Sequence, residues 1–322
     1  MTDTVLVLKP LRPEGRELLE RRANTRVIGI DAPTPEAVAD ALRDADALCV
    51  KNTAITEAML ANAPRLRVVS KHGVGLDNLP MEALTARGVP VATVGDANAP
   101  SVTEHAVMLM LGLARRVVQY DARTRAGGYI IDPDWPTRDL GGKRLLLVGV
   151  GRIGGRVARV AIAMGMAVSA HDPFAGTLPD GVERESDLRA ALGRADVVSL
   201  HCPLTPDTHH LIDASALEAM RPGAMLVNTG RGELVDEAAL LAALEAGHLG
   251  GAGLDVFESE PPDPANPLFA RGDVLLSPHS AALTEEGAIR MARITAENAI
   301  AGLDGTLDPA FVANAEVLRR AA

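Results

Sequence analysis

Residues 144–172 of this chain, RLLLVGVGRIGGRVARVAIAMGMAVSAHD, decide how the rest of the sequence is interpreted. The apolar run 144–148 predicts a buried strand, and the glycine-rich segment 149–154 predicts a tight turn. A helix is predicted from Ile153, followed by a second strand that ends at Asp172. This order of strand, turn, helix and strand is typical of a parallel α/β sheet.

The spacing of the glycines in the turn favours a dinucleotide site. Gly149 permits the turn, Gly151 lets the backbone approach a pyrophosphate, and Gly154 allows the helix to pack closely, so we expect the intervening Arg152 and Ile153 to contact the cofactor as well. Asp172 follows Gly149 by 23 positions, near the roughly 20 that separate such a turn from a ribose-binding carboxylate. Because a carboxylate there repels a 2′-phosphate, the predicted cofactor is NAD rather than NADP.

Strand-like and helix-like segments alternate on both sides of this unit. The first series covers residues 5–94, and the second runs from Arg144 to about residue 278. A long helix that starts near Ser101, with Ser101 as N-cap and Glu104 completing a capping box, is expected to link the two. The predicted fold class is α/β with two doubly wound parallel sheets.

Composition excludes several classes of protein. The formal net charge is −10 and aromatic residues make up 2% of the 322 residues, which argues against a nucleic-acid partner. The apolar stretch 106–114 is shorter than the about 20 residues that cross a bilayer, and no signal peptide is visible, so no membrane association is expected. Cys49 and Cys202 lie in separate segments without metal-site or redox spacing, which favours a reducing cytoplasm.

Polar residues follow three of the strands predicted in the second series. Arg231 comes after GAMLVN, Asp255 and Glu260 come after GAGL, and His279 comes after DVLLSP. Because parallel strands end at one edge of a sheet, we expect these segments to converge near the cofactor.

These motifs together resemble the D-isomer-specific 2-hydroxyacid dehydrogenase family. The likeness covers GVGRIG with Asp172, HCPLTPDTHHLI, VNTGRGELVDE, GLDVFESEPP and SPHSA. It implies a Rossmann NAD-binding domain, residues 99–284, inserted into a smaller flavodoxin-like substrate domain formed by residues 1–98 and 285–322.

The resemblance also implies an enzyme in which three residues carry the chemistry. Arg231 would bind the substrate carboxylate with its guanidinium fork. His279 would exchange a proton with the substrate oxygen as general acid and base. Glu260 would hydrogen-bond His279 and raise its pKa, which keeps the imidazolium available near neutral pH.

Further site residues are implied by the same resemblance. Substrate contacts are expected from Lys51, Lys71, His72, Gly73, Val74, Gly75 and Asn98, besides Arg231 and His279. Cofactor contacts are expected from Val74, Cys202, Pro203, Thr229, Gly230, Asp255 and Ala282, besides the glycine turn. No metal is predicted, since His201 and Cys202 are adjacent on a strand and point to opposite faces.

The substrate stays open at this level. Hydroxypyruvate with glycerate, glyoxylate with glycolate, and 3-phosphoglycerate are all expected candidates, although lysine at positions 51 and 71 replaces the arginines typical of phosphoglycerate dehydrogenases. The alternative is an NAD(H)-sensing, non-enzymatic protein resembling the family's corepressors. A homodimer is expected by resemblance, through the helix from Ser101 and the loop containing Trp135.

Overall fold

A computed structural model describes residues 2–129 and 136–319 of the chain. The chain forms two compact units, one of residues 1–98 and 283–322 and the other of residues 99–282. The chain returns from the second unit to the first at Leu283, two residues before the predicted domain boundary at residue 285. Trp135, predicted to take part in dimerisation, lies outside the described residues.

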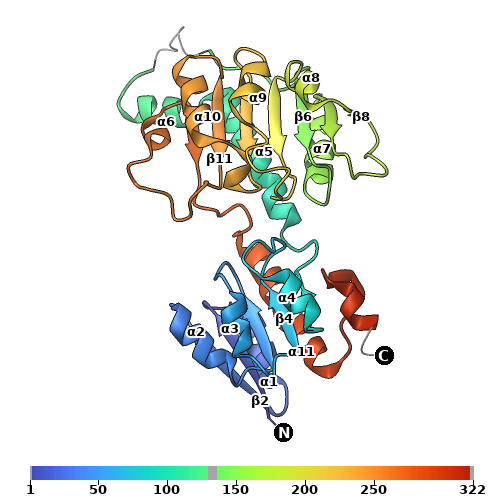
Figure 1. The fold of residues 1–322 in the computed structure, drawn as a ribbon. Coiled ribbons are helices and arrows are strands. Elements are labelled where there is room, and N and C mark those ends of the chain that lie inside the picture. The colour runs from blue at the N-terminus through green and yellow to red at the C-terminus, as the bar shows by residue number, and fades with distance from the viewer. Residues whose placement is uncertain (1, 130–135, 320–322) are drawn as a thin grey trace. The chain divides into compact units, whose positions relative to one another are not determined.

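The first unit is built on a parallel sheet of five strands in the order β2-β1-β3-β4-β5 (Figure 1). This order is that of flavodoxin-like folds. Its elements within the described residues are β1 (Asp3–Leu8), α1 (Pro13–Arg21), β2 (Thr25–Ile30), α2 (Pro35–Leu42), β3 (Ala47–Val50), α3 (Glu57–Ala61), β4 (Val68–Lys71), α4 (Met81–Ala86), β5 (Val91–Ala92), α11 (Glu285–Asp304) and the short 3₁₀ turns Pro309–Phe311 and Ala315–Arg319.

Helix α11 belongs to this unit because its apolar face packs on the sheet. Ala292, Ala296 and Ala299 of α11 are fully buried in a cluster that includes side chains of β1, β3 and β4. Small residues permit this close approach. A Cβ added at Gly302 would lie 2.5 Å from the side chain of Val68 on β4. Helix α11 therefore covers a sheet whose strands all come from the first hundred residues.

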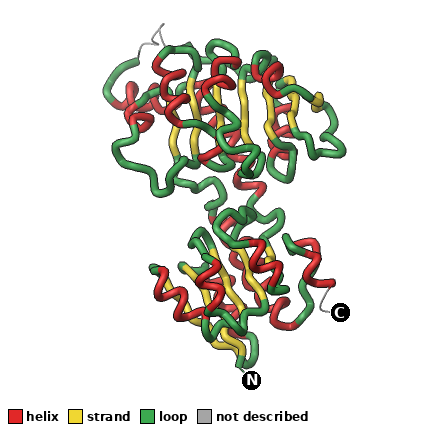
Figure 2. Tube along the Cα trace, in the orientation of Figure 1, coloured by secondary structure: helices red, strands yellow, loops and turns green. Residues whose placement is uncertain are grey.

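The second unit contains a parallel sheet of seven strands in the order β12-β11-β10-β9-β6-β7-β8. Figure 2 shows helices covering both faces of this sheet. Its elements within the described residues are α5 (Ala99–Arg115), α6 (Val117–Arg125), β6 (Arg144–Val148), α7 (Gly154–Ala163), β7 (Ala167–His171), β8 (Val182–Arg184), α8 (Leu188–Leu192), β9 (Val197–Leu200), α9 (Ala214–Ala219), β10 (Met225–Asn228), a 3₁₀ turn (Gly232–Leu234), α10 (Glu237–Glu245), β11 (Gly251–Leu254), a second 3₁₀ turn (Pro267–Ala270) and β12 (Val274–Leu276). The predicted fold class is confirmed.

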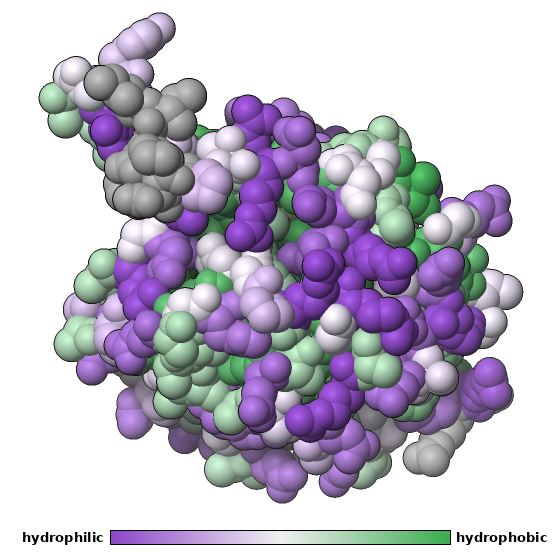
Figure 3. Space-filling view, turned by 90° about the horizontal axis from the view of Figure 1, so that it is seen from above, coloured by the Kyte–Doolittle hydropathy of each residue, from purple (hydrophilic) through white to green (hydrophobic). Residues whose placement is uncertain are grey.

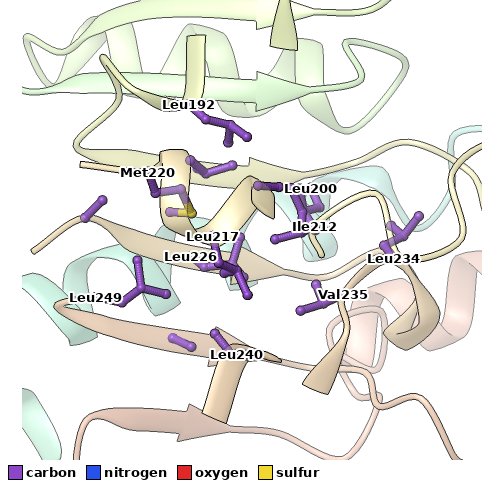
Figure 4. Close-up of a cluster of buried hydrophobic side chains, with 14 of the residues drawn as sticks. Leu192, Leu200, Ile212, Leu217, Met220, Leu226, Leu234, Val235, Leu240 and Leu249 are labelled. Atoms are coloured by element: carbon purple, nitrogen blue, oxygen red, sulfur yellow. The ribbon is translucent and has the colours of Figure 1, made fainter. Parts of the chain in front are cut away.

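Two hydrophobic layers hold this second sheet in place. On one face, side chains from α8, α9 and α10 meet the strands, and Figure 4 shows Leu217, Leu226 and Leu240 together in that layer. On the other face, α5 and α7 pack on the same strands through residues such as Leu109 and Val157. Both layers leave the carboxyl ends of the strands to the loops, which is where open α/β sheets bind ligands.

The structure corrects the predicted start of α5. The helix begins at Ala99, so Ser101 is buried inside its first turn and is not the N-cap. Pro100 is tolerated there because the first turn of a helix has amides without intrahelical partners. Strands β5 and β8 were not predicted, since β5 has only two residues and β8 contains the charged residues Glu183 and Arg184, so neither forms an apolar run.

No helix in the described part of the chain is long and apolar enough to cross a membrane. The face drawn in Figure 3 is covered mainly by hydrophilic side chains, with small hydrophobic patches between them.

Candidate active site in the second unit

The glycine turn after β6 has the geometry that a pyrophosphate requires. Gly149 has φ +91°, a left-handed conformation that favours glycine, and a Cβ there would lie 2.8 Å from the amide nitrogen of Cys202. A Cβ on Gly154 would lie 2.2 Å from the carbonyl oxygen of Gly149, which fixes α7 against the turn. Nothing lies within 4 Å of the position of a Cβ on Gly151. The turn is therefore closely packed at Gly149 and Gly154 and has free space next to Gly151. Arg152 is exposed and Ile153 is half-buried at the start of α7.

Asp172, at the end of β7, is tied to the same turn. One carboxylate oxygen accepts a hydrogen bond from the Val150 amide at 2.9 Å, and the other accepts from the amides of Phe174 and Ala175 at 3.0 and 3.1 Å. These bonds hold a half-buried carboxylate beside the turn, where it can still accept hydrogen bonds from two ribose hydroxyls.

Thr229 supplies a further observation that fits a bound cofactor. Its residue is 9% exposed, and its hydroxyl has no hydrogen-bond partner among the described residues. A buried polar atom normally has a hydrogen-bond partner, so this hydroxyl after β10 is compatible with a contact to a bound cofactor. Gly230 follows it, and its amide donates to the side-chain oxygen of Asn228 at 3.0 Å.

The other expected cofactor residues of this unit lie in loops after strands. Cys202 and Pro203 follow β9, which is paired with β6, so they lie next to the glycine turn. Burial raises the pKa of the Cys202 thiol to about 11, which argues against a nucleophilic thiolate. Ala282 is half-buried at the end of the loop that carries His279.

The predicted contact between His279 and Glu260 is present. Nδ1 of His279 lies 2.7 Å from Oε2 of Glu260, and the two side chains are 41% and 33% exposed. The other oxygen of Glu260 accepts from the amide of Phe257 at 3.3 Å. Because this contact uses Nδ1, the proton that His279 can exchange with a substrate is the one on Nε2.

The pKa of His279 is shifted in the predicted direction. The hydrogen bond to Glu260 raises the pKa of His279 above its ordinary value against the opposing effect of burial. Partial burial alone would raise the pKa of Glu260, but the hydrogen bond from His279 and its charge lower that pKa below the ordinary range. The imidazolium form of His279 is thus stabilised toward higher pH.

Arg231 lies near both members of this pair. Its positive charge lowers the pKa of His279 and of Glu260, so the three groups share one local field. The side chain of Asn228 donates to the Arg231 carbonyl at 2.7 Å, and Nη1 of Arg231 donates to the Gly230 carbonyl at 2.7 Å. A guanidinium, an imidazole and a carboxylate therefore converge at the carboxyl edge of the second sheet.

Asp255, expected near the cofactor, is 1% exposed and holds the loop that carries His279. Its carboxylate accepts from the Ser277 hydroxyl at 2.6 Å and from the amides of Ser280 and Ala281, both at 2.9 Å. Nε2 of His105, on α5, lies 2.7 Å from the Ser277 hydroxyl. Sequence reasoning missed His105 and Ser277, because their partners are far away in the chain.

In the first unit, the two lysines expected to meet the substrate are bound to their own chain. Lys71, 7% exposed, donates from Nζ to the Lys51 carbonyl and, at 2.6 Å, to the side-chain oxygen of Asn78. Nζ of Lys51 donates to the Pro10 carbonyl at 2.6 Å. Both ammonium groups thus fix the loops after β1, β3 and β4.

The loop after β4 contains His72, which is held in a neutral form. Its Nδ1 lies 2.9 Å from the hydroxyl of Thr295, and burial lowers its pKa to about 4. Gly73 has φ +153°, while Val74 and Gly75 are half-buried in the same loop. Asn98, at the end of this unit's N-terminal segment, is 8% exposed.

No group of three or more His, Cys, Asp or Glu side chains in the described residues could hold a metal ion. His209 and His210 stack on each other, and His210 pairs with Glu258.

Comparison with known proteins identifies relatives for both units. Residues 107–281 match the family model of the D-isomer specific 2-hydroxyacid dehydrogenase NAD binding domain. A glyoxylate reductase of Aeropyrum pernix is 38% identical over 98% of this chain and 97% of its own length. A D-3-phosphoglycerate dehydrogenase of Methanocaldococcus jannaschii is 36% identical over 94% of this chain, which spans 58% of that longer protein.

Solved structures show the same architecture. The TT0316 protein from Thermus thermophilus superposes with a TM-score of 0.88 at 36% identity, covering 96% of this chain and 99% of that one. D-lactate dehydrogenase from Aquifex aeolicus, solved with NAD and lactic acid, superposes with a TM-score of 0.83 at 27% identity, covering 94% and 96%.

Proposed function

Because this chain belongs to the D-isomer specific 2-hydroxyacid dehydrogenase family, we propose that it reduces a small unphosphorylated 2-oxo acid to the D-2-hydroxy acid with NADH. The family assigns it as an NAD(P)-dependent oxidoreductase that acts on the CH–OH group of small 2-hydroxy acids. The observation that carries the finer proposal is the 2.7 Å contact between His279 and Glu260 beside Arg231. This arrangement favours an enzyme over the NAD(H)-sensing alternative, which needs no proton donor.

In the proposed mechanism each residue of the trio has a separate task. Arg231 binds the substrate carboxylate and polarises the neighbouring carbonyl. Nε2 of His279 donates a proton to the carbonyl oxygen and takes it back in the oxidation direction. Glu260 fixes the imidazole through Nδ1 and keeps it protonated. A nicotinamide cofactor held by the turn after β6 would supply the hydride.

The cofactor is proposed to be bound by the turn after β6. Gly149, Gly151 and Gly154 shape a surface open to a pyrophosphate, and the N-terminus of α7 favours its negative charge. Asp172 would accept hydrogen bonds from the ribose hydroxyls and repel a 2′-phosphate, which is why we prefer NAD over NADP. The Thr229 hydroxyl, which has no hydrogen-bond partner in the described part of the chain, and the buried Asp255 are proposed to border the nicotinamide half.

We favour an unphosphorylated substrate such as glyoxylate or hydroxypyruvate over 3-phosphoglycerate. The ammonium groups of Lys51 and Lys71 are engaged by backbone carbonyls, and His72 is neutral at physiological pH. We propose that the backbone amides of Gly73 and its neighbours contact the substrate carboxylate, while Asn98 contributes a polar side chain.

Steady-state oxidation of NADH tests this proposal. The purified protein is supplied with glyoxylate, hydroxypyruvate, pyruvate or phosphohydroxypyruvate, in parallel with NADPH. We expect the highest kcat/KM for glyoxylate or hydroxypyruvate with NADH, and a loss of at least about 100-fold in His279→Ala. Preference for the phosphorylated acid would refute the substrate assignment. An active His279→Ala variant would refute the proton donor.

A homodimer through α5 and α6 is also proposed. Met108, Leu111, Val117 and Val118 on these two helices are 47%, 39%, 53% and 58% exposed, and a partner subunit would remove this apolar surface from water. Light scattering at micromolar concentration measures the mass directly. A monomeric mass would contradict the proposal.

We further propose that the protein works in the cytoplasm. Cys49 and Cys202 are both free, and burial raises the pKa of the Cys49 thiol to about 12. Free thiols fit a reducing compartment. Cell fractionation with an antibody to the protein tests this, and recovery outside the cytoplasm would contradict it.

A further inference from the structure

The loop that presents His279 is held in a strained conformation. His279 has φ +51°, in the left-handed region that residues with a Cβ rarely adopt. Such a backbone persists only where surrounding bonds determine it. The His279 amide donates to the Asp255 carbonyl at 2.7 Å, and the next two amides donate to the Asp255 carboxylate. The position of His279 therefore depends on the position of Asp255.

The Asp255 carboxylate is itself held through Ser277. The carboxylate only accepts, so the Ser277 hydroxyl donates to it at 2.6 Å, and the hydroxyl oxygen then accepts from Nε2 of His105 at 2.7 Å. Nε2 of His105 also lies 3.6 Å from the carboxylate. The hydrogen bonds thus run in one direction, from His105 through Ser277 to Asp255.

Helix α5, which carries His105, packs closely on the second sheet. Leu109, one turn further along α5, packs on β11, where a Cβ added at Gly253 would lie 3.0 Å from it. Asp255 follows β11 and Ser277 follows β12, so His105 reaches the ends of both strands from one fixed helix. The His105 side chain is 17% exposed and Asp255 is 1% exposed, so water competes little for these bonds.

We propose that His105 and Ser277 are positioning residues for proton transfer, which hold Asp255 and through it keep the imidazole of His279 aligned with Glu260. In this proposal neither residue contacts the substrate or the cofactor. The inference rests on the proposed function and adds to it two residues that act through Asp255. A small misplacement of a proton donor lowers the rate without preventing binding.

The test compares matched pairs of variants in the full-length protein. His105→Leu and Ser277→Ala remove the bonds, while His105→Gln and Ser277→Thr retain a donor and a hydroxyl. Thr103→Val is the control on the same helix, since Thr103 is 5% exposed and its hydroxyl donates within α5, to the Ala99 carbonyl at 2.7 Å.

We expect His105→Leu and Ser277→Ala to lower kcat about 5- to 10-fold, with the KM for NADH changed by less than about two-fold. The pKa of His279, followed by NMR in histidine-labelled protein and assigned with His279→Ala, should fall in both variants, because a misaligned ring loses its bond to Glu260. The charged groups that face His279 are Glu260, Arg231 and Asp255, and all remain in these variants. The conservative variants and Thr103→Val should behave like the unmodified protein.

Other outcomes distinguish a failure of this inference from a failure of the proposed function. A lower melting temperature with unchanged kcat and unchanged His279 pKa in His105→Leu would reduce the network to a structural role and overturn the inference. Equal losses in Thr103→Val would overturn it as well. If His279→Ala keeps its turnover, the proposed function fails instead. The NMR titration still decides whether His105 governs the imidazole when no tested acid is reduced.

Discussion

Replacing Glu260 with glutamine removes a charge from the catalytic pair and leaves its shape almost unchanged. The amide oxygen of glutamine can still accept from Nδ1 of His279, so the 2.7 Å contact is retained as a neutral hydrogen bond. What disappears is the carboxylate that raises the pKa of His279. The imidazolium, which is the acid in the direction of reduction, is then lost at a lower pH.

The size of the effect follows from the contact and its exposure. A hydrogen bond to a charged group contributes about 1.5–3 kcal/mol and a neutral one about 0.5–1.5 kcal/mol. The side chains of His279 and Glu260 are 41% and 33% exposed, so the lower end of this difference, about 1 kcal/mol, applies. A change of about 1 kcal/mol corresponds to roughly a five-fold lower kcat/KM for reduction near neutral pH.

The assay is kcat/KM for reduction measured from pH 5 to pH 9. Because the folded protein raises the pKa of His279, activity in the direction of reduction should be full at low pH and fall as pH rises through that pKa. In Glu260→Gln the fall should come at a lower pH, and the oxidation direction should shift in the same sense. Glu258→Gln is the matched control, since Glu258 is also 33% exposed and pairs with His210 instead. An unchanged alkaline limb in Glu260→Gln would refute the role of this carboxylate.

Three further substitutions test other parts of the structure. Arg231→Lys replaces a fork by a point charge and should lower kcat/KM for the 2-oxo acid by about 10- to 100-fold, mainly through KM, with NADH binding by fluorescence unchanged; an unaltered KM would contradict carboxylate binding. Asp172→Ser removes the charge facing a 2′-phosphate, so the ratio of kcat/KM for NADH to that for NADPH should fall about ten-fold, and a constant ratio would disprove the discrimination. Gly302→Ala places a methyl group 2.5 Å from the Val68 side chain and should lower the free energy of unfolding by about 1–3 kcal/mol in urea titrations. Gly272→Ala, where nothing lies within 4 Å, should leave it nearly unchanged, and equal effects of the two would rule out the packing argument.

Much of the fold follows from local sequence. An apolar run such as RLLLV at residues 144–148, placed directly before a glycine turn and a helix, predicts a buried parallel strand, and the glycines after it permit the tight turn. The α/β class and a dinucleotide cofactor could be predicted for this reason, whereas the family was identified through the resemblance of several motifs along the chain. The predicted contact between His279 and Glu260 is present because both follow strands of one sheet.

What local sequence could not supply depends on long-range contacts. Strands β5 and β8 exist because neighbouring strands offer them a partner, and α5 begins at Ala99 where a capping box at Ser101 was expected. The hydrogen bonds from His105 through Ser277 to Asp255 join residues 150 positions apart in the sequence. Hydrophobic periodicity does not reveal contacts between residues so far apart in the chain.

By itself, then, the sequence determined the longer strands and helices and the glycine turn, because periodicity, turn glycines and residue type act over a few neighbouring positions. Tertiary structure alone decided the charge of His72 and the hydrogen bonds that hold Lys71 and Asp255. Burial makes His72 neutral, the Lys71 ammonium donates to the Lys51 carbonyl, and an amide of the loop that carries His279 donates to the Asp255 carboxylate. These are consequences of desolvation and of bonds between distant strand ends, which arise only when the sheets are assembled.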